Sequence, residues 1–335
     1  MPTALADLIA VRTDESGRTE YCFAAVAPDS KQRPAAPPPG TTPLGGSWPL
    51  AVRNDPKGRG RYLVASRALR AGELVCAEDP FAQTVHDALH DVVCHHCYDV
   101  LNEGRVLFDG APLEPRQPSS AAAAKPLTCG KCAQVRYCSA ECMRDGAALH
   151  GFECEVLHAI AARSGGGSAS SGLRGLRLFI RLVRKASADP AEFAQVEANL
   201  VEHYTDAPPE RKRFLEGMAM QINKLVPPEC RMEPTRLAKL VSRAHTNLHA
   251  ISDMAGVQYG SGLYPRYGHL LNHSCDPSAV VSFRGRTWRL HITRPVAAGE
   301  EVSIAYTELY AGKAERRQAL RAKKAFDCTC RRCEA

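Results

Sequence analysis

Apolar residues recur at intervals of three or four through the middle of the chain. Five of them mark the first such segment: Leu173, Leu176, Phe179, Ile180 and Val183. This spacing places apolar side chains on one face of an α-helix. We therefore expect helices across residues 173–250. One segment should stop near residues 208–209 and another should run over residues 213–225, because a pair of prolines ends each pattern.

Short apolar runs bounded by turn residues flank this helical region on both sides. They lie at residues 61–66, 73–77, 280–283, 288–293 and 302–305. Short runs separated by glycine-containing turns are typical of β-strands. A further strand is expected near residues 21–23, and residues 315–324 predict a basic helix with a solvated face. The pattern indicates an α+β protein in which short strands precede and follow a helical insert.

Composition shifts predict where the chain divides. Residues 31–49 are dense in proline and glycine and predict a linker without regular structure, and residues 104–126 and 164–172 predict loops. We expect an N-terminal segment with linker, the first part of the main domain, a cysteine-rich finger, a helical insert, the core of the main domain and a cysteine-rich end. Their bounds are 1–49, 50–93, 94–154, 155–245, 246–310 and 311–335.

The 335 residues suit one large domain or two ordinary ones, and 44% hydrophobic residues predict a folded core. No apolar run approaches the roughly 18 residues that cross a bilayer. Acidic residues interrupt the first thirty positions, so we expect no signal or transit peptide there. These features predict a protein of the nucleus, the cytoplasm or both, without membrane contact.

The most informative residues are the fourteen cysteines, most of which fall in closely spaced pairs. The first block contains Cys94, Cys97, Cys129, Cys132, Cys138, Cys142, His150 and Cys154. Cysteines separated by two residues chelate zinc in a tight turn, and ligands four apart share one helix face. Eight ligands suit two ions, although spacing alone leaves their pairing open. His95 and His96 inside the first turn are expected to be exposed side chains rather than ligands.

A third metal site is indicated at the end of the chain by Cys328, Cys330 and Cys333. Three thiolates leave a tetrahedral zinc ion one ligand short. Cys275, fifty-three residues before Cys328, is the natural fourth ligand and would join two distant segments. The alternative is a disordered tail. The remaining cysteines, Cys22, Cys76 and Cys230, are isolated, and we expect ordinary thiols there.

The formal charge of +7 does not by itself indicate a nucleic-acid-binding protein. Zinc ligands are thiolates, so eleven coordinated cysteines and three zinc ions together lower that charge by about five. The basic excess then nearly disappears, and we expect no direct contact with nucleic acid. A DNA-binding zinc-finger factor would instead lose affinity steeply with salt.

Several motifs together resemble one enzyme family. Residues 268–277, GHLLNHSCDP, and residues 299–306, GEEVSIAY, resemble the core of a SET domain. Residues 57–61, KGRGR, resemble its N-terminal cofactor loop, the first cysteine block resembles a MYND zinc finger, and the cysteine-rich end resembles a post-SET segment. The order of these parts over residues 50–335 is that of the SET-and-MYND protein-lysine methyltransferases.

The resemblance implies a SET-domain β-fold with a pseudoknot, split by the MYND finger and the helical insert and closed by the post-SET zinc segment. It also implies an interleaved ligand pairing in the finger. Cys94, Cys97, Cys138 and Cys142 would hold one ion, and Cys129, Cys132, His150 and Cys154 the other. All twelve ligands of the three ions are protein side chains, so the zinc is expected to be structural.

The implied reaction is transfer of a methyl group from S-adenosylmethionine to a protein lysine, with a histone among the candidate substrates. The resemblance assigns the catalytic role to Tyr306, which would orient the lysine amine and the methyl group. The implied cofactor contacts are Lys57, Gly58, Arg59, Gly60, Asn247, His269, Asn272, His273, Tyr306 and Phe326. Taken alone, the glycine loop near Gly58 and the Asn272–His273 pair would be ordinary turns.

One residue departs from the family pattern. Lys324 stands where family members often carry a second tyrosine, and a cation there would oppose binding of a sulfonium unless the side chain points to solvent. The competing interpretation is therefore a catalytically weak SET/MYND adaptor that binds proline-rich partners through its finger. For either function we expect a monomer.

Overall fold

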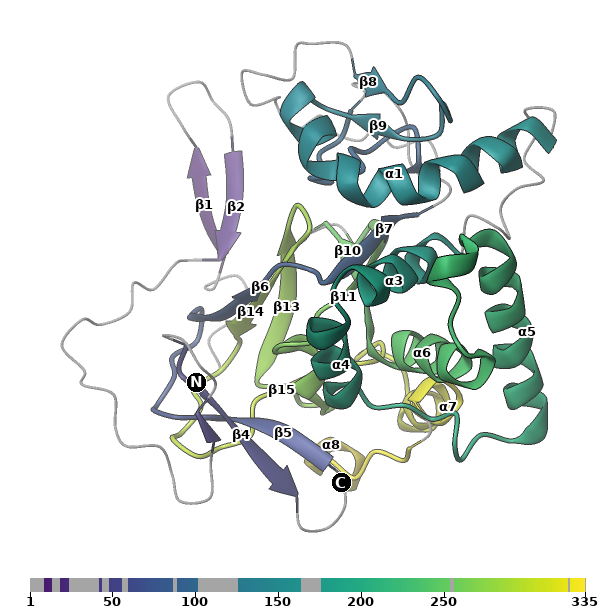
Figure 1. The fold of residues 1–335 in the computed structure, drawn as a ribbon. Helices are drawn as coiled ribbons and strands as arrows, with labels where there is room; N and C mark the ends of the chain where they lie inside the picture. Colours follow the sequence, from purple (N-terminus) through teal and green to yellow (C-terminus); the bar gives the residue numbers. More distant parts are fainter. Residues whose placement is uncertain are drawn as a thin grey trace. The chain divides into compact units, whose positions relative to one another are not determined.

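The computed structural model describes residues 9–13, 19–23, 42–43, 48–55, 60–86, 89–101, 126–163, 176–253, 256–324 and 326–334. The chain forms two compact units. The first takes Met1–Glu78, Arg266–Ser282 and Trp288–Ala335, and the second takes Asp79–Pro265 and Phe283–Thr287. Mixed strands and helices make up the described chain, as expected for an α+β protein (Figure 1).

The first unit is built from short strands. β3 (Thr42–Pro43), β4 (Leu50–Asp55) and β5 (Gly60–Ala65) form an antiparallel sheet. β13 (Ala279–Arg284), β14 (Thr287–Ile292) and β6 (Leu74–Glu78) form a second sheet in that order. Along β14, Trp288, Leu290 and Ile292 are buried at every second position, the period that places side chains on one face of a sheet.

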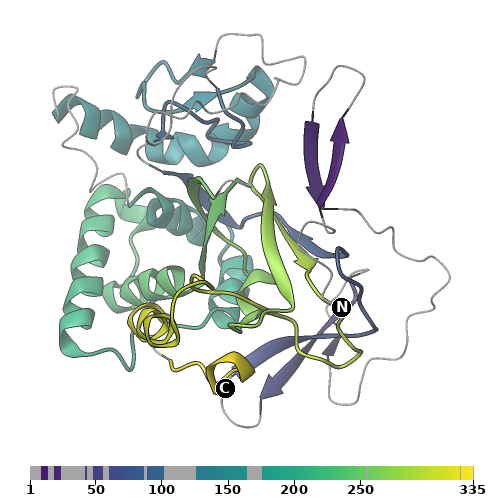
Figure 2. The ribbon, with the colours of Figure 1, turned by 180° about the vertical axis from the view of Figure 1, so that it is seen from behind.

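Two more pairings complete the described strands of this unit. β1 (Ile9–Thr13) and β2 (Thr19–Phe23) form an antiparallel hairpin. β12 (Asn272–His273) pairs in parallel with β15 (Ser303–Ile304). The 3-10 turn η5 (Gly268–Leu270) precedes β12, and the helices α7 (Lys313–Lys324) and α8 (Arg331–Glu334), yellow in Figure 2, end the described chain.

The second unit combines one sheet, a finger and the helical insert. β10 (Leu248–Ser252), β11 (Gln258–Leu263) and β7 (Ala82–Val85) are antiparallel in that order. The finger contains the hairpin β8 (Leu127–Thr128)–β9 (Arg136–Tyr137) and the long helix α1 (Ala140–Arg163). The insert contains α3 (Arg177–Ala188), α4 (Pro190–Asn199), α5 (Pro209–Leu225), the 3-10 turn η4 (Pro228–Cys230) and α6 (Pro234–Asn247).

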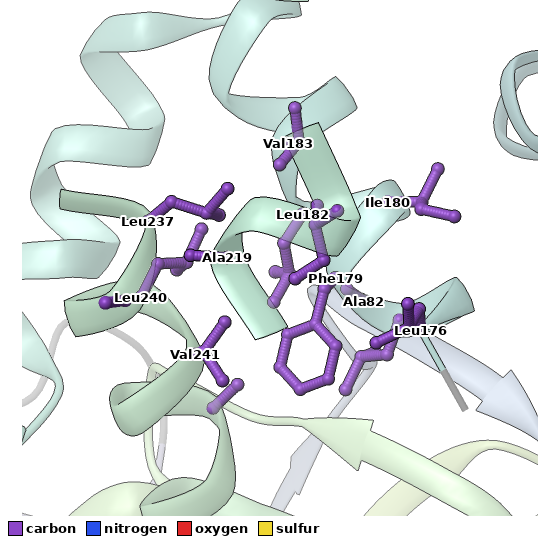
Figure 3. Close-up of a cluster of buried hydrophobic side chains, with 14 of the residues drawn as sticks. Ala82, Leu176, Phe179, Ile180, Leu182, Val183, Ala219, Leu237, Leu240 and Val241 are labelled. Atoms are coloured by element: carbon purple, nitrogen blue, oxygen red, sulfur yellow. The ribbon is translucent and has the colours of Figure 1, made fainter. Parts of the chain in front are cut away.

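The helical insert encloses the core drawn in Figure 3. Phe179, Leu182 and Val183 of α3 pack in one cluster with Ala219 of α5 and Leu240 of α6. Each fully buried valine, leucine or phenylalanine side chain stabilises the fold by about 1.5–3 kcal/mol. This burial confirms the apolar period predicted for residues 173–183 where the structure describes them.

Proline marks the starts of these helices as well as their stops. Asp189 caps α4 by accepting from the Glu192 N–H at 2.9 Å, and Pro190 follows it as the first helical residue. Pro has no N–H to lose at that position, so it suits the start of a helix. The expected stop at residues 208–209 is therefore wrong in detail, because α4 ends at Asn199 and Pro209 begins α5.

The expected strands are present with shifts of one or two residues, and two other expectations need correction. The linker predicted over residues 31–49 contains the strand β3, which pairs with β4 and is held by that partner rather than by its own sequence. The helical pattern expected up to residue 250 ends at Asn247, where β10 begins. The loop predicted at 164–172, and residues 104–125 of the loop predicted at 104–126, lie outside the described residues. None of the described helices is long and apolar enough to span a membrane.

Candidate active site and metal centres

Two strands bring together segments of the first unit that are thirty-one residues apart. Asn272 is opposite Ser303 and His273 is opposite Ile304, and the Ser274 N–H donates to the Ile304 carbonyl at 2.9 Å. Parallel strands need a long crossover, which the β13–β14 hairpin provides here. The pairing places Tyr306, two residues beyond β15, beside the Asn272 segment.

Tyr306 is held at both ends. Its N–H donates to Nδ1 of His273 at 2.9 Å, and its hydroxyl donates to the carbonyl of Leu271. Burial, with a smaller contribution from the Glu301 carboxylate, raises the pKa of Tyr306 to about 12. The phenol is therefore protonated near neutral pH, and its oxygen has a defined position.

Three aromatic rings meet around this position. The ring centroid of Tyr306 lies 5.5 Å from that of His273 and 6.5 Å from that of Phe326, and the last two are 6.1 Å apart. Asn272 is oriented by donating its side-chain amide to Oε1 of Glu301 at 3.0 Å. The predicted residues Asn272, His273, Tyr306 and Phe326 are thus brought together by the fold. Such a cluster can hold a flat aromatic group and orient a polar one.

Lys324 also points into this cluster rather than to solvent. Its Nζ lies 5.3 Å from the ring centroid of Tyr306, and burial lowers the pKa of its amine. Burial favours the uncharged form of a lysine because the charged form loses hydration. The repulsion expected between a lysine cation and a sulfonium at this place is therefore reduced by the surroundings of the amine.

The other predicted cofactor contacts that the structure describes belong to several different elements. Gly60 adopts a positive φ of 82°, and an added Cβ there would have no atom within 4 Å. Lys57, Gly58 and Arg59 lie outside the described residues. His269 is part of the turn η5. Asn247 belongs to the second unit, where its side chain donates to the carbonyls of Val201 and Arg243 at 2.9 and 2.7 Å.

The sequence analysis missed a buried carboxylate that holds residues 266–268, at the start of η5. Glu78, at the end of β6, accepts from the N–H groups of Arg266, Tyr267 and Gly268 at 2.8, 2.8 and 3.2 Å. Burial raises the pKa of Glu78 although these three donors act in the opposite direction. The residue anchors the segment that leads into η5 and β12. An acidic residue ending an apolar strand was the only sequence signal for it.

The structure gathers twelve predicted metal ligands into three groups. The first group is Cys94, Cys97, Cys138 and Cys142, the second is Cys129, Cys132, His150 and Cys154, and the third is Cys275, Cys328, Cys330 and Cys333. Within each group all ligand atoms lie within 4.8 Å of one another. The first two groups have the interleaved pairing that the resemblance implied.

The spacing of the sulfur atoms fits zinc. A zinc–sulfur bond of about 2.3 Å places the sulfurs of a tetrahedral site about 3.8 Å apart. The Cys138–Cys142, Cys129–Cys154 and Cys275–Cys328 sulfur pairs are separated by 3.4, 3.7 and 3.9 Å. Each group also supplies four protein ligands, so an ion there has no position left for water or substrate.

Both chelating turns of the finger share one backbone feature. Tyr98 follows Cys97 with φ 71°, and Ala133 follows Cys132 with φ 54°. The next N–H then donates to the sulfur, from Asp99 to Cys97 and from Gln134 to Cys132, at 3.5 Å in each case. A side chain in this left-handed region costs about 1–2 kcal/mol. The strained backbone conformation of each turn thus directs an N–H group toward the sulfur.

A buried polar cluster supports the second group. His150 faces Cys132 Sγ through Nε2 at 3.6 Å and Glu153 Oε1 through Nδ1 at 3.4 Å. Glu153 is fully buried and also accepts 2.7 Å bonds from Arg177 and Arg181 of α3. Burial alone would raise the pKa of Glu153, but the two guanidinium groups hold it well below its usual range. The carboxylate fixes the histidine ring, a common arrangement behind a zinc ligand.

His95 is part of the same cluster, which corrects the expectation that it is exposed. It is 4% exposed, with Nε2 2.8 Å from the His90 carbonyl and Nδ1 3.3 Å from Nη2 of Arg177. Burial, followed by the charge of Arg177, holds the pKa of His95 well below its usual range. The uncharged ring therefore accepts from an arginine, and it is absent from the three ligand groups of the described residues.

Arginines contact the third group directly. Arg316 of α7 is 4% exposed, and its guanidinium lies 3.2 Å from Cys275 Sγ and 3.8 Å from Cys333 Sγ. Arg317 donates to the Cys328 carbonyl at 3.1 Å, and Arg332 donates to the Cys275 carbonyl at 3.1 Å. The prediction of a solvated basic face is therefore wrong for Arg316, because that face packs on the thiols.

Comparisons with known proteins agree with these features. The family model described as the SET domain matches residues 60–307. Histone-lysine N-methyltransferase SMYD3 of Mus musculus is 29% identical over 82% of this chain and 59% of its own length, and that of Homo sapiens gives the same three percentages. N-lysine methyltransferase SMYD2-B of Danio rerio is 24% identical over 82% of this chain and 58% of its own. The chain thus spans less than two thirds of these relatives.

A solved structure gives a more distant match. The SET domain of LSMT bound to lysine and AdoHcy aligns with 84% of this chain and 54% of that chain, at a TM-score of 0.36 and 13% identity.

Proposed function

The chain belongs to the SET-domain family, and on that premise we propose that it is an S-adenosylmethionine-dependent protein-lysine N-methyltransferase. The family model covers residues 60–307, and the relatives reported above are named as lysine methyltransferases. One observation carries the proposal. The β12–β15 pairing holds the Tyr306 hydroxyl on the Leu271 carbonyl, beside Asn272, His273 and Phe326.

The residues around Tyr306 fit S-adenosylmethionine. The rings of His273 and Phe326 offer apolar faces for an adenine, and the Asn272 carboxamide offers polar contacts for the amino-acid end. The oxygens of the Tyr306 hydroxyl and the Leu271 carbonyl lie next to each other, and oxygen dipoles favour a cationic sulfonium. When bound, the cofactor would supply a methyl group that its sulfonium already activates.

The protein's own part in the reaction is to select and align an uncharged amine. A free lysine has a pKa of about 10.4, so its amine must lose a proton before it can attack. Enclosure among aromatic rings disfavours the ammonium form. Tyr306 keeps its own proton, because its pKa is raised to about 12, and it can orient the amine through its oxygen. Alignment of the reacting atoms supplies much of the remaining acceleration.

We also propose that each cysteine group holds one structural zinc ion. The sulfur spacings and the complete sets of four ligands support this assignment. Burial opposes ionisation at all three of Cys94, Cys129 and Cys330, one cysteine in each group, but hydrogen bonds from neighbouring side chains and backbone N–H groups lower the pKa of each. Thiolates are the form that binds zinc.

The proposed partner is a protein that presents a lysine, with a histone among the candidates. We further propose that the MYND finger binds a proline-rich peptide and that the protein is a monomer. We also propose that it does not contact nucleic acid and that it is located in the nucleus or cytoplasm. The low net charge of a zinc-loaded chain supports the view that nucleic acid is not a partner. Size-exclusion chromatography with light scattering and DNA binding at two salt levels test the oligomeric state and the nucleic-acid contact.

The direct test is transfer of labelled methyl groups from S-adenosylmethionine to proteins of a cell extract. We expect labelled lysines, and a loss on the order of 10²-fold in Tyr306→Phe because an aligned hydroxyl is removed. Tyr310→Phe is the matched control, since Tyr310 is 91% exposed. Calorimetry with S-adenosylhomocysteine separates binding from transfer. Binding of proline-rich peptides with no transfer by the native chain would favour the adaptor instead.

A further inference from the structure

Helix α7 turns one face toward the third cysteine group and the aromatic cluster. Arg316, Leu320 and Lys324 follow one another at intervals of four residues, which places them on the same helix face. Arg316 contacts the Cys275 sulfur, and Leu320 is 1% exposed within the cluster of Cys275, Cys328 and Cys333. Lys324 is the last residue of this face, and its amine lies next to the Tyr306 ring.

The surroundings of the Lys324 amine are those the reaction requires of a substrate lysine. The amine faces the Tyr306 ring at 5.3 Å, and the His273 and Phe326 rings adjoin that ring. Burial lowers the pKa of Lys324, which increases its uncharged fraction at neutral pH. A four-carbon stem with several rotatable bonds allows the amine to move within the cluster while the helix stays in place.

We propose that Lys324 is itself a methyl acceptor, modified by the active site of its own chain. This inference rests on the proposed function and deepens it. In the reaction the Nζ lone pair forms a bond to the methyl carbon as the carbon–sulfur bond breaks. The electron pair of that bond remains on sulfur, giving neutral S-adenosylhomocysteine, and the amine proton leaves to solvent.

Two consequences follow from an acceptor within the same chain. The reaction is intramolecular, so the fraction of modified chains at a given time does not depend on protein concentration. Methylation also enlarges the amine and retains its charge when protonated, so it changes the space available beside Tyr306. The modified and unmodified chains are therefore expected to differ in their rate with added protein substrates.

The first experiment maps methylation on the full chain. The native protein is incubated with labelled S-adenosylmethionine at two widely different protein concentrations, and its peptides are analysed by mass spectrometry. We expect label at Lys324 to the same extent at both concentrations. Lys324→Arg should lose that label, whereas Lys313→Arg, a control in the exposed first turn of α7, should retain it.

Mixing separates reaction within a chain from reaction between chains. Isotope-marked Tyr306→Phe, which retains Lys324, is mixed with unmarked native protein and cofactor. We expect label at Lys324 of the unmarked chains only. Equal label on the marked chains would overturn the intramolecular proposal. Labelled extract proteins together with unmodified Lys324 would overturn the inference and leave the proposed function standing. No label on any protein, despite bound cofactor, would remove both.

A second experiment does not depend on turnover. Lysines of the native protein are acylated with a small reagent, with and without S-adenosylhomocysteine, which carries no methyl group to transfer. Because the amine is inferred to share the cofactor pocket, acylation of Lys324 should slow several-fold on binding, while acylation of Lys313 stays unchanged. Equal rates for Lys324 with and without the bound product would contradict its placement in the pocket.

Discussion

The second and third cysteine groups contain similar ligands and differ in what surrounds them. With zinc, three thiolates and a histidine carry a net charge of about −1, and four thiolates carry about −2. Behind the second group the guanidinium groups of Arg177 and Arg181 meet the carboxylate of Glu153, which in turn meets His150. At the third group Arg316 contacts two sulfurs directly. The third group, which carries more negative charge, is thus contacted by an arginine directly, whereas at the second group a glutamate lies between the arginines and the ligand His150.

The two groups also differ in how much chain they join. The ligands of the second group lie between Cys129 and Cys154, whereas the third joins Cys275 to residues 328–333. Cys275 follows β12 by two residues, so the third group holds the strand that carries Asn272 and His273. The comparison indicates that the second group stabilises its own finger and that the third organises the candidate active site.

The largest expected effect tests this division directly. Cys275→Ser should remove one zinc ion and lower methyl transfer on the order of 10²-fold, because small displacements of aligned groups cost that much. Cys132→Ser should also remove one ion but lower transfer far less, since the second group lies in the other unit. Zinc content by atomic emission and transfer rate are measured together. Equal losses of activity in the two variants would contradict the division.

The buried acid behind the second group gives the next effect. Glu153→Gln leaves two buried guanidinium groups without their carboxylate and should cost about 3–5 kcal/mol of unfolding free energy. Denaturant unfolding measures this loss. Glu155→Gln is the control two residues later on α1, where an exposed pair with Lys131 should contribute little. If both variants unfold alike, the cluster does not stabilise the finger.

The direct arginine contact at the third group predicts a change in metal affinity. Arg316→Met removes the positive charge beside two sulfurs and should weaken zinc binding by about 10–100-fold, the usual cost of losing a supporting contact. Arg321→Met on the same helix should have no such effect, because Arg321 is exposed and pairs with Asp327. Competition with a chelator measures both, and similar affinities would remove the case for charge compensation.

The smallest effect concerns the backbone of the finger. Ala133→Gly should raise the unfolding free energy by about 0.5–1 kcal/mol, because glycine adopts φ 54° without the penalty of a side chain. Ala147→Gly, at an exposed position inside α1, should lower it by a similar amount. Thermal and denaturant unfolding measure whether each variant has a higher or lower unfolding free energy than the native chain. A loss of stability at position 133 would show that its methyl group packs usefully.

Local patterns in the sequence predicted elements and short-range ligand pairs well. The apolar period of α3 and the paired spacing of Cys129 and Cys132 each depend on a few consecutive residues and on fixed backbone geometry. Predictions were weaker where burial by a distant segment decides. His95, Arg316 and Lys324 were all expected at the surface or left open, and each is directed inward by a partner far along the chain.

The sequence by itself determined the types of metal ligand, because the spacing of cysteines within turns and helices specifies them. Its motifs also identified the resemblance to the SET-domain family. Through that resemblance it also predicted that Asn272, Tyr306 and Phe326 lie close together. Only the tertiary structure decided which charged groups stand behind each set of thiolates and where Lys324 points. The physical reason is that hydration, burial and charge pairing depend on neighbours in space, whereas periodicity reports only neighbours along the chain.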